Sequence, residues 1–358
     1  MKLPCITMLA ALLLTAPAAA QLQITPPATT PSAPAEKQKA KPHAITKKKE
    51  TAPAPKPSAS PKPSPSPKPA ATVIPAPPTD DPNVDLVFGA YQRGQYKTAF
   101  ELATARAQAG DPKAMTMLGE LYSNAMGIRR DYAKAAEWYK RAADAGDREA
   151  MFALAMLRIS GRGGPVDKNE AVKLMASAAK LGEPKAAYNL ALLYLDGQTL
   201  PQDVRRSAEL LRQAADAGLP EAQYALATFY KEGTGVPKDP ERAVRLLQAA
   251  SLADNVDAEV EYAIAMFNGT GTPKNQPAAV ALLRKASRQG SAIAQNRLAW
   301  VLINGVGTSM DKVEGFKWHL VAKTTGKGDP ELDKQFSELP AEDRSKAEAA
   351  ARKWLGTK

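Results

Sequence analysis

Apolar and polar positions alternate at helical spacing along the chain, and the whole pattern returns every 36 residues between residues 110 and 326. Its glycines are Gly110, Gly146, Gly182, Gly218, Gly290 and Gly326, with Asp254 in the one remaining place. Its alanines are Ala114, Ala150, Ala186, Ala222, Ala258 and Ala294, and its polar positions are Asp131, Asp167, Asp203, Asp239, Asn275 and Asp311. A period of this length predicts a solenoid of stacked structural repeats.

Each repeat contains two segments with the apolar spacing of a helix. In the repeat near residue 220, the first helix is predicted from about Ala222 to Lys231. It ends at Gly233 and Gly235, since glycine tolerates the positive φ that a helix end and a tight turn require. The second helix is predicted to begin at Asp239, whose side chain can cap the first turn.

Two repeats carry a fuller signal for the start of the second helix. Asp167 is followed three residues later by Glu170, and Asp311 by Glu314. This spacing predicts a capping box, in which the glutamate side chain reaches back to the backbone N–H of the capping residue.

Further alanines recur on both helices of the repeat. On the first helix they are Ala155, Ala191, Ala227, Ala263 and Ala299, and on the second Ala142, Ala178, Ala214, Ala250, Ala286 and Ala322. Small residues at fixed places let antiparallel helices approach closely, so a larger residue there is expected to overpack the contact.

The pattern "AxxxLAxxYxxGxGVxxDxxxAxxxxxxAAxxG" resembles the Sel-1-like repeat (SLR) family, a relative of the tetratricopeptide repeat (TPR) family, over residues ~110–326. The resemblance implies an all-α fold, a right-handed α-solenoid of helix-turn-helix repeats. It also implies that the first helices line a concave face used for binding.

The repeats and the segments on either side of them divide the chain into five parts. Residues 81–109 resemble a TPR-like capping unit, with Tyr91, Gly94, Tyr96 and Ala99 in its motif. Six SLR repeats fill 110–326, and two capping helices are expected within 327–358, where Pro330 replaces the recurring alanine. The signal peptide (1–20) and a Pro/Ala/Lys-rich linker (21–80) precede the helical part.

The first twenty residues have the features of a secretory signal peptide. Lys2 precedes an apolar run of roughly ten residues, and Ala18 and Ala20 favour cleavage before Gln21. The alternative, a retained membrane anchor, needs a longer apolar run. We therefore expect an exported, periplasmic protein, or an extracellular one, without a transmembrane span in the mature chain.

Residues 21–78 form a Pro-rich and Lys-rich arm that has almost no large apolar residue. It carries nine lysines against Glu36 and Glu50, which accounts for +7 of the net charge of +11. This composition predicts a disordered, extended polyproline II segment. The arm could be a tether, or it could contact the cell wall or an anionic polysaccharide; nucleic acid is not expected, because the arm lacks aromatic residues and arginine.

Catalytic and metal-binding residues are scarce. Cys5 is the only cysteine, and His43 and His319 are the only histidines. Most zinc sites, Ser-His triads and Cys-His pairs therefore lack their parts. His319 stands where other repeats have a large packed side chain, and we expect no catalytic residue, no metal and no cofactor.

Residues that vary between the first helices are the candidates for partner binding. They are Phe152, Met156, Tyr188, Leu192, Leu195, Tyr224, Lys231, Phe267 and Trp300. The larger ones among them are expected to be partly exposed, because aromatic and aliphatic anchors dominate binding between proteins. The alternative is that neighbouring first helices pack together and bury them.

These features favour a non-catalytic scaffold that binds another envelope protein or a peptide segment, and so assembles or regulates an envelope system. Sensor kinases, exopolysaccharide machinery and cell-wall machinery are the systems that the resemblance suggests. A peptidoglycan or polysaccharide binder is the alternative. A hydrolase is less favoured, because the SLR relatives linked to β-lactams are rich in cysteine and this chain has none in its repeats.

Overall fold

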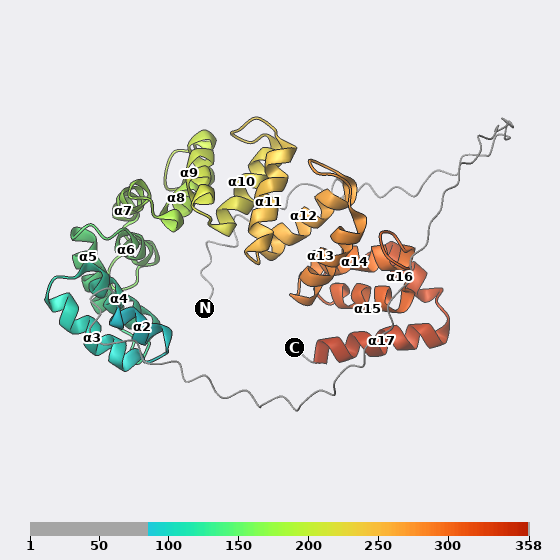
Figure 1. The fold of residues 1–358 in the computed structure, drawn as a ribbon, viewed down its shortest axis with the longest axis horizontal. Helices are drawn as coiled ribbons and strands as arrows, with labels where there is room; N and C mark the ends of the chain where they lie inside the picture. The colour runs from blue at the N-terminus through green and yellow to red at the C-terminus, as the bar shows by residue number, and fades with distance from the viewer. Residues whose placement is uncertain (1–84, 357–358) are drawn as a thin grey trace, which may run out of the picture. The chain divides into compact units, whose positions relative to one another are not determined.

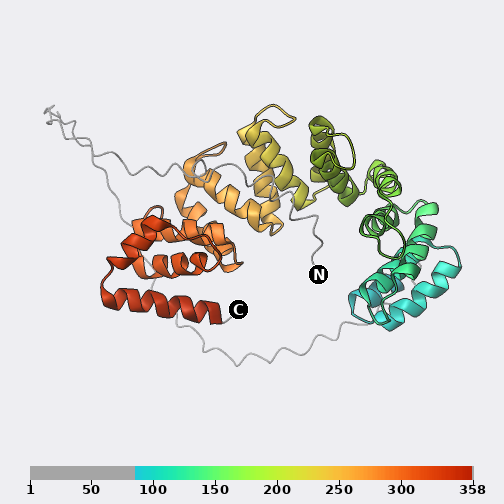
Figure 2. The same cartoon turned by 180° about the vertical axis from the view of Figure 1, so that it is seen from behind.

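The computed structural model describes residues 85–356, and this part of the chain holds sixteen α-helices and no strand. The signal peptide (1–20), the Lys/Pro arm (21–80), Cys5 and His43 lie outside the described residues. Each helix after the first packs against the helix before it in the chain, except the last helix, which packs against the one two places before it (Figure 1); Figure 2 shows the same succession from behind. The all-α solenoid predicted from the period is therefore confirmed.

Twelve of these helices form six helix pairs that begin at intervals of 36 residues. The first helices are α4 (Pro112–Asn124), α6 (Arg148–Ser160), α8 (Pro184–Asp196), α10 (Pro220–Glu232), α12 (Val256–Asn268) and α14 (Ala292–Asn304). The second helices are α5 (Tyr132–Asp144), α7 (Lys168–Lys180), α9 (Val204–Asp216), α11 (Pro240–Leu252), α13 (Gln276–Arg288) and α15 (Lys312–Lys323).

The recurring aspartate sets the angle between the two helices of a repeat. The side chain of Asp239 accepts the backbone N–H of Arg242 at 2.9 Å, as an N-cap does. Its own N–H donates to the Tyr230 carbonyl on the first helix at 2.9 Å. The equivalent residues of the other five repeats make the same pair of bonds, so each second helix starts from a fixed point on the first.

This second bond corrects the capping boxes expected from the sequence. The N–H of Asp167 is already bonded to the Arg158 carbonyl, so Glu170 has no free donor to reach. Glu170 instead binds Arg158 Nε at 2.7 Å. Glu314 likewise turns to Lys317 and to Trp318 Nε1, at 2.8 and 2.9 Å.

Glycine ends the first helix and also permits close contact between repeats. Gly161 adopts φ 64° at the end of α6, in the left-handed region that other residues avoid. A Cβ on Gly163 would lie 2.1 Å from the Tyr132 carbonyl oxygen, so the backbone of this turn contacts the start of the preceding second helix. The two glycines of the pair are therefore needed for different reasons: the first for its positive φ, the second because a side chain there would collide with the preceding second helix.

The recurring alanines form the interior. All six second-helix alanines from Ala142 to Ala322 are fully buried, and the first-helix alanines from Ala155 to Ala299 are at most 1% exposed. Larger side chains such as Leu154, Leu211 and Leu298 fill the space beside them. The predicted packing role of these alanines is therefore confirmed.

Two helix pairs cover the ends of the repeat array. At the N-terminal end, α2 (Leu86–Gln92) and α3 (Tyr96–Gln108) pack against α4. At the C-terminal end, α16 (Pro330–Ser337) is followed by α17 (Ala341–Gly356), which packs along α15 with Trp354 5.0 Å from Trp318. None of the helices described between residues 85 and 356 combines the length and the apolar character that a bilayer crossing demands.

Candidate functional site

The fifth, ninth and twelfth positions of the six first helices define a surface that we call the first-helix face. On α6 these positions are Phe152, Met156 and Ile159. Residues spaced by four and then three positions lie on one side of a helix. Because the helices begin 36 residues apart, the same three positions recur on each neighbouring repeat and extend the face.

The structure places most of the predicted partner-binding residues at intermediate exposure on this face. They are Phe152, Met156, Tyr188, Leu192, Leu195, Tyr224 and Trp300. Lys231 is exposed and its ammonium binds Glu261 of the next first helix at 3.0 Å. Phe152, Tyr188 and Tyr224 stand at the fifth position of the first helices of the second, third and fourth repeats.

Phe267 differs from the expectation of exposure, because its side chain is only 6% exposed. It occupies the twelfth position, which also borders the second helix of its own repeat. The equivalent Ile303 shows the reason: a Cβ on Gly315 of α15 would lie 2.6 Å from Ile303 Cγ1. The twelfth position is therefore partly interior, and Phe267 belongs to the packing of its repeat.

A cavity of about 440 Å³ opens on the first-helix face between α4 and α6. Its apolar wall contains Phe152 and Met156, two of the residues that the sequence analysis selected as candidates for partner binding. Its polar rim was not predicted. This rim contains Glu120, Glu149, Glu183, Lys185 and Arg162. The only sequence signal for it is Glu120 itself, a charged residue at the ninth position, where most repeats are apolar.

Hydrogen bonds orient the acidic side of the cavity. The Tyr91 hydroxyl on α2 donates to Glu120 Oε1 at 2.7 Å. Burial and this carboxylate hold the pKa of Tyr91 well above its usual range. Burial also raises the pKa of Tyr139, which lines the same cavity, to about 12. Both phenols therefore remain neutral donors at physiological pH.

Tyr188 and Tyr224 continue the face beyond the cavity. Burial, with the nearby charge of Glu221, raises the pKa of Tyr188 to about 12. Burial also holds the pKa of Tyr224 above its usual range, and the negative charges of Glu261, Asp257 and Glu232 raise this pKa as well. The face thus combines apolar rings with hydroxyl donors that lie in a negative field.

The acidic charge near Tyr224 comes largely from α12, which has Asp257, Glu259 and Glu261 and no basic residue. Burial and the neighbouring Glu261 raise the pKa of Asp257. Glu261 is paired with Lys231, whereas Asp257 makes no ion pair with another described residue. This end of the face favours a cationic group over an anionic one.

The single histidine in the described residues is a packing residue. His319 is fully buried, and its ring lies edge-on to Phe316 with 6.4 Å between ring centres. Its Nε2 is 2.8 Å from Asp333 Oδ1 on α16. Between residues 85 and 356 no group of three His, Cys, Asp or Glu side chains is arranged to hold a metal ion.

Comparison with protein families identifies the repeats. The family model described as Sel1 repeat matches residues 112–147, 148–183, 184–219, 220–255, 256–291 and 292–322. These ranges follow the helix pairs described above, each starting at the first residue of a first helix. A search of curated protein sequences finds no match.

Solved structures support the same relationship. A Sel1 repeat protein from Oxalobacter formigenes is 27% identical, with a TM-score of 0.60 over 67% of this chain and 98% of that chain. A protective antigen present in uropathogenic Escherichia coli strains, which has an SLR fold, is 24% identical, with a TM-score of 0.51 over 75% of this chain and 67% of that one. The second likeness, at this identity, concerns the fold alone.

Proposed function

Because this chain belongs to the Sel1 repeat family, we propose that it is a non-catalytic scaffold that binds another protein through its first-helix face. Sel1 repeat proteins generally mediate protein–protein interactions. The proposal specifies the surface of this chain that binds the partner and the cellular compartment in which binding takes place.

The observation that carries the proposal is the row of Phe152, Tyr188 and Tyr224 at equivalent positions of three consecutive repeats. All three rings are partly exposed, whereas the leucines two positions further along the same helices, Leu154, Leu190 and Leu226, are buried. A partly exposed aromatic ring supplies a large apolar contact area at a small entropic cost. A helix or extended segment that lies across α6, α8 and α10 would contact all three.

The polar groups around these rings would fix the orientation of the bound segment. The hydroxyls of Tyr188 and Tyr224 remain donors, and the carboxylates of Glu120 and Asp257 are available to accept or to meet a cation. The cavity beside Phe152 and Met156 is large enough for an apolar side chain. We therefore expect a partner segment that carries at least one large apolar residue and one basic residue.

The N-terminal sequence supports an interaction in the cell envelope. The signal-peptide features of residues 1–20 and the Lys/Pro arm of residues 21–80 suit a periplasmic protein whose folded part acts at a distance from its N-terminus. The partner would then be an envelope protein, such as a component of a sensor kinase, exopolysaccharide or cell-wall system.

The proposal is tested by photocrosslinking in cells. A photoreactive phenylalanine analogue is placed at Phe152, Tyr188 or Tyr224, and at Lys168, Arg205 or Glu241 as controls. The control residues are exposed on the second helices α7, α9 and α11, so the two sets sample the two sides of neighbouring repeats. We expect one shared partner band from the first set alone.

A second measurement then uses the identified partner in purified form. The triple variant Phe152→Ala, Tyr188→Ala and Tyr224→Ala should weaken binding at least tenfold. The matched triple variant Lys168→Ala, Arg205→Ala and Glu241→Ala should bind like the unchanged protein. Equal crosslinking from both sets, or equal affinity of both triple variants, would rule out the first-helix face.

A further inference from the structure

The two kinds of helix in the repeats differ sharply in charge. The six second helices contain seventeen Lys and Arg against seven Asp and Glu, an excess of ten positive charges. The six first helices contain six Lys and Arg against eight Asp and Glu, an excess of two negative charges. The positive charge of the repeats therefore lies on the side away from the first-helix face.

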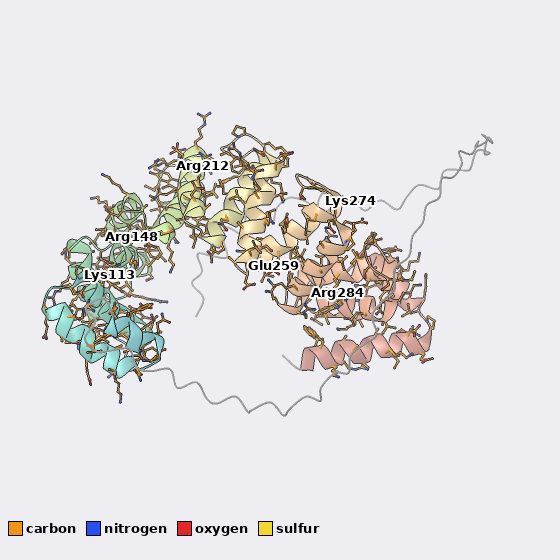
Figure 3. The ribbon with its side chains drawn as sticks, viewed as in Figure 1. Lys113, Arg148, Arg212, Glu259, Lys274 and Arg284 are labelled. Atoms are coloured by element: carbon orange, nitrogen blue, oxygen red, sulfur yellow. The ribbon has the colours of Figure 1, made fainter. Side chains whose placement is uncertain are left out.

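Part of this charge forms a regular row. Each second helix contributes one cation, at its ninth residue in α5, α9 and α13 and at its sixth in α7, α11 and α15. We call these the cationic row: Lys140, Lys173, Arg212, Arg245, Arg284 and Lys317. Figure 3 labels Arg212 and Arg284 of this row, on α9 and α13. Residues three apart lie on one side of a helix, so the alternation keeps the row on one surface.

Most of the row is not neutralised within the fold. Lys140 pairs with Asp144 at 3.0 Å and Lys317 with Glu314 at 2.8 Å. Lys173, Arg245 and Arg284 make no ion pair with a described residue, and Arg212 donates only to the neutral Tyr230 hydroxyl at 3.2 Å. Lys140, Lys173, Arg212 and Arg245 are exposed.

Acidic neighbours reduce this charge only in part. Glu137 and Glu209 lie one turn before Lys140 and Arg212, and Glu209 is already held by Arg206 at 2.7 Å. In the other four second helices, the sixth or ninth residue that does not belong to the row is uncharged. These residues are Ala176, Gln248, Ala281 and Leu320. Since neutral residues serve equally well at these surface positions, packing does not explain why every repeat keeps one cation.

We infer that the cationic row binds a linear acidic polysaccharide, which lies along the second helices and meets one cation in each of the first five repeats. Lys317 of the sixth repeat is only 14% exposed, because its ammonium lies against the rings of Trp318 and Trp354. The second helices recur every 36 residues along the chain, so the row offers one cation in each repeat. A polymer with regularly spaced carboxylates matches such a row, because each repeat of the protein meets an equivalent part of the chain. The row then gives the protein a second binding surface, independent of the first-helix face.

A membrane surface fits the same residues less well. Helices that lie on a bilayer insert large apolar side chains between their cations. The exposed large apolar residues of the described chain are scattered, and near the central members of the row they are limited to Leu181, just after α7, and Leu252, at the end of α11. A row one residue wide on each helix suits a thread-like ligand.

The test uses the full mature chain and polygalacturonate, a linear acidic polysaccharide, with fully methyl-esterified polymer as the uncharged control. The variant Lys173→Glu with Arg245→Glu reverses two exposed members that have no ion pair in the fold. We expect at least a tenfold loss of affinity and a shallower dependence on NaCl concentration. The uncharged polymer should not bind the unchanged protein.

A matched variant separates the row from net charge. Lys238→Glu with Lys274→Glu changes the net charge equally at two exposed lysines outside the second helices, and the Lys/Pro arm is the same in all proteins. We expect this variant to keep its affinity, as should Phe152→Ala with Tyr188→Ala and Tyr224→Ala. An equal loss in both charge variants, or row-dependent binding to phosphatidylglycerol vesicles without binding to the polymer, would overturn the inference. Neither result would bear on partner binding by the first-helix face.

Discussion

The ring of Tyr139 on α5 occupies the space where residue 119 of α4 would carry its Cβ, 2.5 Å from Tyr139 Cε1. Residue 119 is Gly, whereas the equivalent position of every other repeat is Ala. The equivalents of Tyr139 are smaller or narrower, and most are Leu or Met. The two residues therefore compensate each other in volume.

This compensation predicts a coupled stability effect. Gly119→Ala should lower the free energy of unfolding by ~1–3 kcal/mol through overpacking, although alanine is the better helix former. Adding Tyr139→Leu, which recreates the Ala191–Leu211 pair of another repeat, should recover most of the loss. Urea unfolding of the two single variants and the double variant measures the coupling. Additive effects would show that the two side chains do not constrain each other.

Glu259 and Lys285 form the second pair with a measurable consequence. Glu259, labelled in Figure 3, is fully buried and its Oε1 lies 2.5 Å from Lys285 Nζ, while Oε2 has no partner. Two other repeats have Gln at this position, Gln223 and Gln295, and Gln295 donates to the Ser287 carbonyl at 3.1 Å. The carboxylate has no proton with which to repeat that bond.

Removing the lysine should therefore cost more than removing the charge it neutralises. Lys285→Met should lower the free energy of unfolding by ~1–3 kcal/mol, because it leaves a buried carboxylate without a cation. Glu259→Gln should be close to neutral, and the double variant should be more stable than Lys285→Met alone. Thermal and urea unfolding at pH 7 give the comparison. A loss on Glu259→Gln as large as on Lys285→Met would contradict this account.

The first repeat ends its first helix on an unfavourable residue. Ala125 adopts φ 59° at the end of α4, where Gly161 stands in the next repeat. A left-handed conformation costs a residue with a Cβ ~1–2 kcal/mol. Ala125→Gly should therefore raise the free energy of unfolding by about 1 kcal/mol. Ala176→Gly, at an exposed position within α7, is the control and should lower it by ~0.5–1 kcal/mol.

The contact between α15 and α16 predicts a dependence on pH. Hydrogen bonds from Lys323 and from His319 hold the pKa of Asp333 below its usual range. The folded pKa lies below the unfolded value of about 3.9, so this contact stabilises the fold above pH ~4 and the benefit disappears as pH falls through the folded pKa. Because Asp333 is 39% exposed, its contribution is at most about 1 kcal/mol.

The matched variant is Asp333→Asn. It should be less stable than the unchanged protein at pH 6, and the difference should shrink toward zero below pH 3. Unfolding followed between pH 2.5 and pH 7 measures it. A constant difference over this range would mean that Asp333 acts by packing alone.

The sequence was most informative where a local rule decides the structure. The period fixed the spacing of the helices, and Asp239 and its equivalents are N-caps as predicted. The capping boxes failed, because a backbone carbonyl of the first helix competes for the N–H that Glu170 would have to reach. That competitor belongs to another helix, and a motif of four residues does not reveal it.

The candidate site was less predictable for a related reason. The sequence identified which positions vary, but whether a varying side chain is exposed depends on residues of the second helix. Phe267 and Lys231 share the twelfth position, and one is buried while the other reaches solvent. The rim of the cavity was missed because its glutamates come together from three places: Glu120 on α4, Glu149 on α6 and Glu183 at the N-cap of α8.

The different burial of Phe152 and Phe267 gives a prediction that also guides the binding experiments. Phe267→Ala should lower the free energy of unfolding by ~3–5 kcal/mol, the cost of emptying a buried aromatic site. Phe152→Ala should cost at least about 1 kcal/mol less, because part of its ring already meets water. Urea unfolding of both variants tests this order. If Phe152→Ala proved as destabilising as Phe267→Ala, Phe152 would be a packing residue, and reduced partner binding by its variants would report loss of structure instead of loss of contact.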